Sequence, residues 1–245
     1  MKWTPGTLRS KTVWAEGLFT LHVDAPEVLP FTPGQFLQLG LDIAGEEVKR
    51  PYSVASPHSE ILDFYIVEVE DGKLTPSLNR LQPGDSLKIT EKAAGSFTLD
   101  HSPPGNQLWL IATGTGLAPY IAMLRTEEPW DRYQQIVVVH GVRYQADLSY
   151  VDEMHRYARE RTGRFCYVPI VSREDGPESL RGRITHRLED GSLEERAGVE
   201  FNSDCCILMC GNPDMLTDLE AQLLERGIKK HRRKEPGQIV VERYW

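Results

Sequence analysis

The feature that most constrains the fold is a change in apolar spacing at "HSPPGNQ", residues 101–107. Before it, alternating runs such as "LFTLHVDAP" and "LDFYIVEVE" are broken by turn residues about every eight to twelve positions. This spacing is typical of a small antiparallel barrel or sandwich. One helix is expected in this half, in "KLTPSLNRL", with Thr75 as its N-cap and Pro76 as its first residue.

After this stretch, near-continuous apolar runs alternate with amphipathic ones. "LWLIAT" precedes "GTGLAPYIAMLR", "IVVVHGV" precedes "LSYVDEMHRYARER", "FCYVPIVS" precedes "RITHRLED", and "CCILMCG" precedes "NPDMLTDLEAQLLERG". The pattern predicts a parallel sheet with helices on both faces, and ligands bind such sheets at the carboxyl ends of the strands. We therefore expect two domains, an antiparallel β-barrel over 1–100 and an α/β domain over 106–245.

Composition narrows the class of protein. A chain of 245 residues with 40% hydrophobic content can build two cores. The net charge of -8 argues against a nucleic-acid binder, which needs a surplus of Lys and Arg. The start lacks the apolar region of a secretory signal, and no run approaches the length of a membrane span. We expect a soluble, cytoplasmic protein without a membrane partner.

The cysteines argue against a metal cofactor. Cys166, Cys205, Cys206 and Cys210 all lie in the second half, without the spacing of a disulfide framework. They form neither the CxxC pairs of a zinc site nor the pattern of an iron–sulfur cluster. No metal site is predicted.

One candidate binding motif is "RPYSVAS" in the barrel half. Strand alternation places Arg50, Tyr52 and Val54 on one side. The guanidinium could bind a phosphate while the ring stacks on a flat heterocycle. Taken alone, an ordinary strand-edge pair explains the motif better.

Two further motifs follow strands of the α/β half. "IATGTGLAP" is a glycine-rich strand-to-helix turn, where exposed N–H groups favour an anion. "MCGNPDM" places Cys210 at a strand end, with Pro213 opening a helix. A tight turn needs glycine with or without a ligand, and a buried structural thiol is as good a reading of Cys210.

Three arginines also follow predicted strands: Arg143, Arg173 and Arg183. Because parallel strand ends lie on one edge, these arginines could bind one anion. A 2′-phosphate would be such an anion and would select NADPH over NADH. Individually, each is as well explained as a solvated surface charge.

Taken together and in order, these motifs resemble the ferredoxin–NADP reductases over nearly the whole chain. The bacterial ferredoxin/flavodoxin–NADP reductases are the most similar, through "RPYS", "DGKLTPSL", "HGVRYQADLSY", "VSRE", "GRI" and the terminal "VERYW". The resemblance implies FAD and NADPH/NADP+ as cofactors.

The resemblance also implies the site residues. It implies three catalytic residues. Ser53 lies near flavin N5, Cys210 lies beside the nicotinamide, and Trp245 is the third. The FAD-binding residues are Arg50, Pro51, Tyr52, Ser53, Tyr65, Ile66, Val67, Lys73, Leu74, Thr75, Thr115, Tyr244 and Trp245, the last two covering the cofactor. The NADP-binding residues are Arg143, Tyr144, Ser172, Arg173, Arg183, Gly211, Asn212 and Met215.

The implied reaction is hydride transfer between NADPH and flavin N5, followed by one-electron steps to ferredoxin or flavodoxin. The run "KKHRRK", with Lys230, Arg232 and Arg233, is interpreted as a docking surface for such an acidic carrier. A solvated cluster of charges explains this run equally well. A transient, electrostatic complex and a monomeric enzyme are expected.

Three alternatives stay open from the sequence. Two are redox enzymes: the reductase component of an oxygenase, and a flavin or siderophore reductase. The third is a non-catalytic nucleotide-binding regulator, which would not need Ser53 or Cys210.

Overall fold

The computed structural model describes residues 2–232 and 234–243 and separates the chain into two compact units. The first unit comprises Met1–Leu99 and Ala118–Thr126, and the second comprises Asp100–Leu117 and Glu127–Trp245. No helix among the described residues is both long and apolar enough to cross a membrane.

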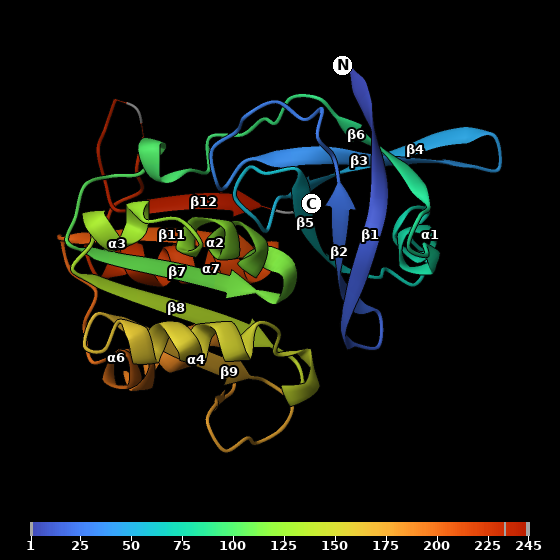
Figure 1. Cartoon of the computed structure of the whole chain (residues 1–245). Helices are drawn as coiled ribbons and strands as arrows, with labels where there is room; N and C mark the ends of the chain where they lie inside the picture. Colours follow the sequence, from blue (N-terminus) through green and yellow to red (C-terminus); the bar gives the residue numbers. More distant parts are fainter. Residues whose placement is uncertain (1, 233, 244–245) are drawn as a thin grey trace. The chain divides into compact units, whose positions relative to one another are not determined.

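The first unit contains an antiparallel six-stranded sheet, drawn mainly in blue and cyan in Figure 1. Its strands are β1 (Trp3–Ala15), β2 (Leu18–Asp24), β3 (Phe36–Ile43), β4 (Glu46–Ser53), β5 (Ile61–Val67) and β6 (Ser86–Thr90). They are ordered β4-β3-β6-β1-β2-β5. Alternating side chains of these strands bury an apolar core that includes Leu21, Leu39, Phe64 and Ile89.

The sheet curls until its two outermost strands meet. Directly after β4, the Ala55 N–H donates to the Asp63 carbonyl of β5 at 2.8 Å. The Asp63 N–H in turn donates to the Ser56 hydroxyl at 3.0 Å. These bonds satisfy some of the backbone hydrogen-bonding groups at both edges of the sheet and close the barrel. The fold predicted for this half is confirmed.

The helix in this unit begins one residue earlier than the cap prediction required. Helix α1 spans Thr75–Arg80, and its N-cap is Leu74, not Thr75. The Thr75 hydroxyl accepts the Val69 N–H at 2.9 Å. The prediction of Thr75 as N-cap is therefore wrong, because a loop donor occupies the oxygen that would have capped the helix.

Helix α2 (Ala118–Leu124) also groups with the first unit, although it directly follows a strand of the second. Arg125, at its end, donates to the Asp63 carboxylate at 2.7 Å and to the Ala55 carbonyl at 3.2 Å. The other oxygen of Asp63 lies 2.6 Å from Nδ1 of His22. An ionic cluster of His22, Asp63 and Arg125 thus joins the end of α2 to β2 and β5.

The second unit is built on a parallel six-stranded sheet, drawn from green to red in Figure 1. Its strands are β7 (Gln107–Thr113), β8 (Gln135–Val142), β9 (Phe165–Val171), β10 (Leu180–Arg181), β11 (Cys205–Gly211) and β12 (Ile239–Arg243). Its helices are α3 (Glu128–Arg132), α4 (Val151–Glu160), α5 (Ile184–Glu189), α6 (Ser192–Ala197) and α7 (Pro213–Glu225). Short 3-10 turns span Leu99–His101, Gly114–Leu117 and Gln145–Asp147.

Helices cover both faces of this sheet. On one face, Leu188 of α5, Leu193 of α6 and Leu219 of α7 share a core with Val137 and Ile207. On the other face, α4 packs its Tyr157 against Phe165 and Trp130. The strands are therefore apolar on both sides, and the prediction of a covered parallel sheet is confirmed.

The strand order places a topological switch point at β7. The order is β10-β9-β8-β7-β11-β12, so the chain winds from β7 toward one edge and then returns to β7's other side. The turns that leave the neighbouring strands β7 and β11 therefore lie at the switch point, at the carboxyl end of the sheet. Open α/β sheets bind ligands in the crevice formed there.

Candidate functional site

The carboxyl ends of β7 and β11 are in direct contact at the switch point. A Cβ atom added to Gly116 would lie 2.5 Å from the Cys210 carbonyl oxygen, so only glycine permits this approach. The Thr113 hydroxyl accepts the Asn212 N–H at 2.8 Å. The sequence motifs "GTG" and "CGNP" therefore lie against each other, with Thr115 in the middle of the first.

Asn212 begins helix α7 as an N-cap. Its side-chain oxygen accepts the N–H groups of Asp214 at 3.0 Å and Met215 at 3.1 Å. Gly211 adopts a φ of 132°, which side chains rarely allow, and redirects the chain from strand to helix. Pro213 opens the helix as predicted, while Met215 packs against the core of the second unit.

A carboxylate lies beside the predicted active-site thiol. Cys210 and Glu242 are register partners in the parallel β11–β12 pair. The Cys210 thiol donates to a Glu242 carboxylate oxygen across 3.9 Å. Cys210 is buried and Glu242 is half-buried, so the pair places one acidic group at the end of β11.

The predicted phosphate-binding residues come together after β8 and β9. The Arg173 N–H donates to the Arg143 carbonyl at 3.0 Å, and the Ser172 N–H donates to the Val142 carbonyl at 3.0 Å. The Arg173 guanidinium lies 5.7 Å from the centre of the Tyr144 ring and donates to its hydroxyl at 3.2 Å. This places two exposed arginines and an exposed aromatic ring at one edge of the sheet.

Arg183 follows β10 next to this group. Arg181 of β10 pairs with Val171 of β9, and the Gly182 N–H donates to the Val171 carbonyl at 2.9 Å. Arg183 is exposed and occupies the N-cap position of helix α5 without a side-chain cap hydrogen bond. Pairing of β10 with β9 thus places Arg183 near the strand end that carries Ser172 and Arg173.

In the first unit, the motif "RPYS" lies on β4, an outer strand of the barrel sheet. Tyr52 is half-buried and, like Val54, packs against the barrel core. Burial raises the pKa of the Tyr52 hydroxyl to about 12, with a smaller opposing effect of Arg50. Arg50 and Pro51 are exposed, and Ser53 is buried.

The other outer strand, β5, and the loop before α1 hold the remaining predicted residues. Tyr65 and Ile66 are buried, whereas Val67 keeps 40% of its surface exposed. Lys73 is exposed and lies 4.0 Å from a Glu46 carboxylate oxygen, while Leu74 is buried. The barrel's outer strands and the loop before α1 therefore offer an aromatic ring, a buried hydroxyl and two exposed cations.

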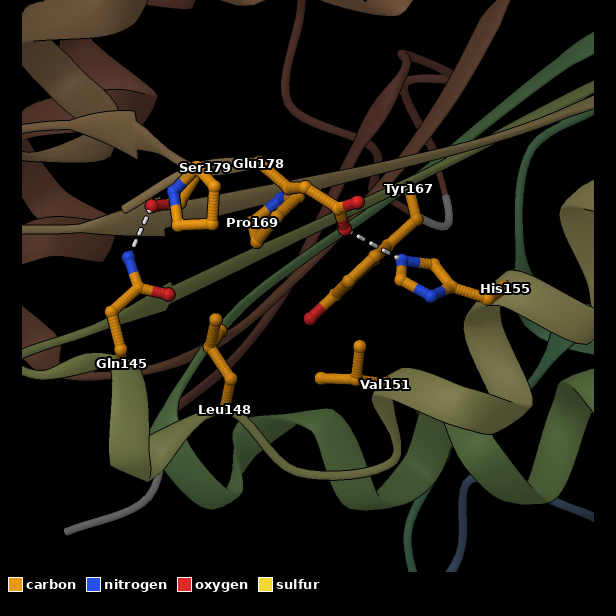
Figure 2. Close-up of a pocket in the computed structure, with 9 residues that line it drawn as sticks. Gln145, Leu148, Val151, His155, Tyr167, Pro169, Glu178 and Ser179 are labelled. Atoms are coloured by element: carbon orange, nitrogen blue, oxygen red, sulfur yellow. Dashed lines mark hydrogen bonds and ion pairs between the residues drawn. The ribbon is translucent and has the colours of Figure 1, made fainter. Parts of the chain in front are cut away.

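A cavity with a volume of about 230 Å³ lies in the second unit between α4, β9 and the loop before β10. Figure 2 shows two pairs at its rim, Gln145 with Ser179 and His155 with Glu178. Tyr167 and Pro169 line it from the sheet. None of the predicted site residues lines this cavity, but the loop that begins at Ser172 and Arg173 forms one of its walls.

Sequence reasoning missed Thr113, His140 and Glu242. His140, fully buried in β8, lies 3.1 Å from the Gly114 carbonyl oxygen, so it contacts the "GTG" turn. An ionisable residue in the apolar run "IVVVHGV" was a visible signal for it. Glu242 had no local signal, because its proximity to Cys210 depends on the β11–β12 pairing.

Some predicted residues lie outside the part of the chain that the structure describes. These are Tyr244, Trp245 and, in the basic run, Arg233. Of the described basic residues, Lys230 binds Glu220 at 2.7 Å, and Arg232 lies 3.6 Å from Glu235. Part of the positive charge of the run is thus balanced within the protein.

Comparison with protein families finds two matching models. The oxidoreductase FAD-binding domain matches residues 7–98, and the oxidoreductase NAD-binding domain matches residues 110–221. The first match covers the barrel strands, and the second covers most of the parallel sheet with the switch point.

Curated and solved relatives agree over the full length. The chain is 44% identical over 246 aligned residues to flavodoxin/ferredoxin–NADP reductases of Shigella flexneri and of Escherichia coli K12, covering 99% of each chain. A crystal structure of a ferredoxin NADP+ reductase from Neisseria gonorrhoeae with bound FAD and NADP matches with a TM-score of 0.94 at 28% identity, covering 100% of both chains.

Proposed function

This chain belongs to the flavodoxin/ferredoxin–NADP reductases, and from that premise we propose how its own residues support the reaction. The protein is an FAD-dependent oxidoreductase that moves electrons between NADPH and ferredoxin or flavodoxin. The observation that best supports the proposed residue roles is the contact between the "GTG" turn and the Cys210 strand end. It lies at the switch point, where a nucleotide is expected to bind.

We assign FAD binding to residues 1–100. Arg50 is exposed and can bind a diphosphate, and the half-buried Tyr52 ring can pack on the flavin. Ser53 follows on the same strand with its hydroxyl proposed near flavin N5. These residues fit the cofactor, because one strand, β4, supplies a cation, a ring and a hydroxyl together.

The rest of the proposed FAD site comes from β4, from β5 and from the loop before α1. Its residues are Pro51, Ser53, Tyr65, Ile66, Val67, Lys73, Leu74 and Thr75. Val67 supports the assignment, because a valine 40% exposed on an outer strand leaves apolar surface for a ligand to cover. Thr115, Tyr244 and Trp245 are proposed to contact the same cofactor.

We assign NADPH binding to residues 106–245. The guanidinium groups of Arg143, Arg173 and Arg183 suit the adenosine 2′-phosphate, since all three are exposed near adjacent strand ends. Tyr144, 43% exposed, can stack on the adenine. Ser172, Gly211, Asn212 and Met215 extend the site along the carboxyl edge of the sheet.

The mechanism requires alignment rather than acid–base catalysis. When bound, FAD supplies hydride acceptance at N5 and single-electron donation to the carrier. Cys210 is proposed to contact the nicotinamide ring and set its distance, and Glu242 orients the thiol as its acceptor. The buried Ser53 hydroxyl supplies a hydrogen bond. Alignment of this kind can contribute several kcal/mol to the rate.

The carrier is proposed to bind transiently through charge. The basic run around residues 229–234 stands out in a chain with a net charge of -8. Ferredoxins and flavodoxins are acidic, so such a surface steers their approach. We further propose a cytoplasmic, monomeric enzyme; its four cysteines are thiols, as expected in a reducing compartment.

The visible absorption spectrum tests the proposal. Purified protein, recorded anaerobically, should show flavin bands that bleach when NADPH is added. Titration with NADH, which lacks the 2′-phosphate, serves as the control for the contribution of that phosphate to binding. A protein that acquires no flavin bands even with added FAD would contradict the assignment.

The acceptor distinguishes the remaining redox alternatives. NADPH-dependent reduction of a ferredoxin or flavodoxin should exceed reduction of free flavin and of ferric chelates under the same conditions. A preference for either small acceptor would favour a flavin or siderophore reductase instead.

A further inference from the structure

His140 is a buried ionisable residue with no part in the mechanism above. It lies in β8 with none of its surface exposed. Burial lowers its pKa to about 4, although the hydrogen bond to Gly114 opposes this effect. The imidazole is therefore neutral at pH 7 and carries one N–H donor and one acceptor nitrogen.

Its two contacts define which nitrogen carries the proton. Nε2 lies 3.1 Å from the Gly114 carbonyl oxygen, which can only accept, so Nε2 is the donor. Nδ1 lies 3.4 Å from the Tyr167 hydroxyl and accepts from it. A hydrogen-bonded chain thus runs from Tyr167 on β9 through His140 on β8 to Gly114 after β7.

Gly114 is where the chain leaves β7 for the "GTG" turn. Its φ of 51° lies in the left-handed region, so the carbonyl of this residue is directed by a conformation that favours glycine. Two residues later, Gly116 packs on the Cys210 carbonyl too closely for any side chain. The turn is therefore held by His140 at one end and by β11 at the other.

We propose that His140 is a positioning residue for hydride transfer, held as its Nε2–H tautomer by the Gly114 carbonyl while Tyr167 donates to Nδ1. By fixing the Gly114 carbonyl, it sets the place of Thr115 and of the turn's N–H groups. This inference rests on the function proposed above, in which Thr115 contacts FAD and a nucleotide binds at the switch point beside the turn. His140 itself touches neither substrate nor cofactor.

The kinetic test compares three variants. His140→Leu removes both hydrogen bonds and should slow flavin reduction at saturating NADPH about tenfold to a hundredfold, because small misplacements cost that much. His140→Gln keeps an N–H donor and should recover most of the rate. Tyr167→Phe should show an intermediate loss. The dissociation constant of NADP+ should change less than about threefold, because the arginines outside the turn dominate binding.

A matched control and a structural readout accompany the kinetics. Tyr157→Phe removes another buried tyrosine hydroxyl of this unit, one that donates to Glu153, and should leave the rate unchanged. The ¹⁵N shifts of the imidazole at neutral pH should show the Nε2–H tautomer in the parent and in Tyr167→Phe, with the Nδ1 resonance shifted in the variant because it loses the hydrogen bond from Tyr167. Amide exchange at Thr115 and Gly116 should accelerate in His140→Leu.

The outcomes separate the two proposals. If the parent protein is not reduced by NADPH, the proposed function fails, whatever the variants do. If the parent is reduced and a folded His140→Leu keeps the full rate, the positioning role is overturned. Should His140→Leu not fold, Tyr167→Phe decides, and an unchanged rate together with an unchanged Nδ1 shift overturns the inference.

Discussion

The Sγ atom of Cys210 lies 3.9 Å from a carboxylate oxygen of Glu242, because the two residues are partners in the parallel β11–β12 pair. Strand pairing therefore brings a thiol and an acid together at the switch point of the sheet. Neither residue lies near the other in sequence. The pair gives the first prediction.

Replacing Cys210 with Ala should lower the rate of NADPH-dependent dye reduction about tenfold, since the thiol no longer sets the nicotinamide distance. Glu242→Gln keeps the size and a hydrogen-bonding group but removes the charge, so a smaller loss is expected. Cys166→Ala is the control, because that thiol bonds to the Arg196 carbonyl within the second unit. The rates are measured by stopped-flow reduction. Full activity of Cys210→Ala would refute the proposed role of the thiol.

Replacing Arg173 or Arg183 with Ala should lower kcat/KM for NADPH about tenfold to a hundredfold, because each loses a charge-assisted bond to phosphate. NADH lacks the 2′-phosphate, so its kcat/KM should change less than about twofold. The nearby Arg181→Ala removes an arginine already bound by Asp175 at 2.6 Å and should leave the preference intact. Equal losses with both nucleotides would exclude the 2′-phosphate assignment.

The ionic cluster of His22, Asp63 and Arg125 should make barrel stability acid-sensitive. Burial opposes ionisation of Asp63, but hydrogen bonds from His22 and Arg125 outweigh it and hold the pKa below the ordinary 3.8. A lowered folded-state pKa gives stability that is complete above the unfolded-state value. It is lost as the pH falls from about 4 through the folded-state pKa.

Arg125→Met breaks this cluster and should lower the free energy of unfolding at pH 7 by about 2 kcal/mol, since a mostly buried carboxylate loses its cation. It should also reduce the acid dependence of urea unfolding below pH 4. Arg9→Met, which breaks the more exposed pair with Asp24, should cost less than about 1 kcal/mol. A similar loss of unfolding free energy in both variants would show that the ion pair of Asp63 stabilises the barrel no more than an exposed pair does.

Removing charge from the basic run should slow reduction of the carrier but leave the reaction with NADPH unchanged. Lys230 is unsuitable for this test, because it neutralises Glu220, which also binds Arg243 of β12. The double variant Arg232→Gln with Lys234→Gln should slow flavodoxin or ferredoxin reduction at low ionic strength about tenfold, with the difference vanishing at high salt. NADPH-to-dye activity should not change.

A matched charge removal on α4 controls for net charge. Arg156→Gln with Arg159→Gln takes two positive charges from an exposed helix face of the same unit. Carrier reduction should then stay at the parent rate. An equal loss in both double variants would indicate a general charge effect and not a docking surface.

The sequence by itself determined the two kinds of sheet and the order of their elements. Alternation with a period of two residues indicates strands with one solvent-exposed face, whereas continuous apolar runs indicate strands buried on both faces. Both signals are local. The turns at "GTG" and "CGNP" were also visible, because glycine and proline restrict the backbone wherever they occur.

Only the tertiary structure decided which distant residues meet. The pairing of β11 with β12 brings Glu242 to Cys210, and that of β8 with its neighbours β7 and β9 brings His140 between Gly114 and Tyr167. The Thr75 cap was wrong for the same reason, since the loop N–H of Val69 took the hydroxyl. Strand register and loop donors depend on the whole packed sheet, so no local pattern of residues encodes these contacts.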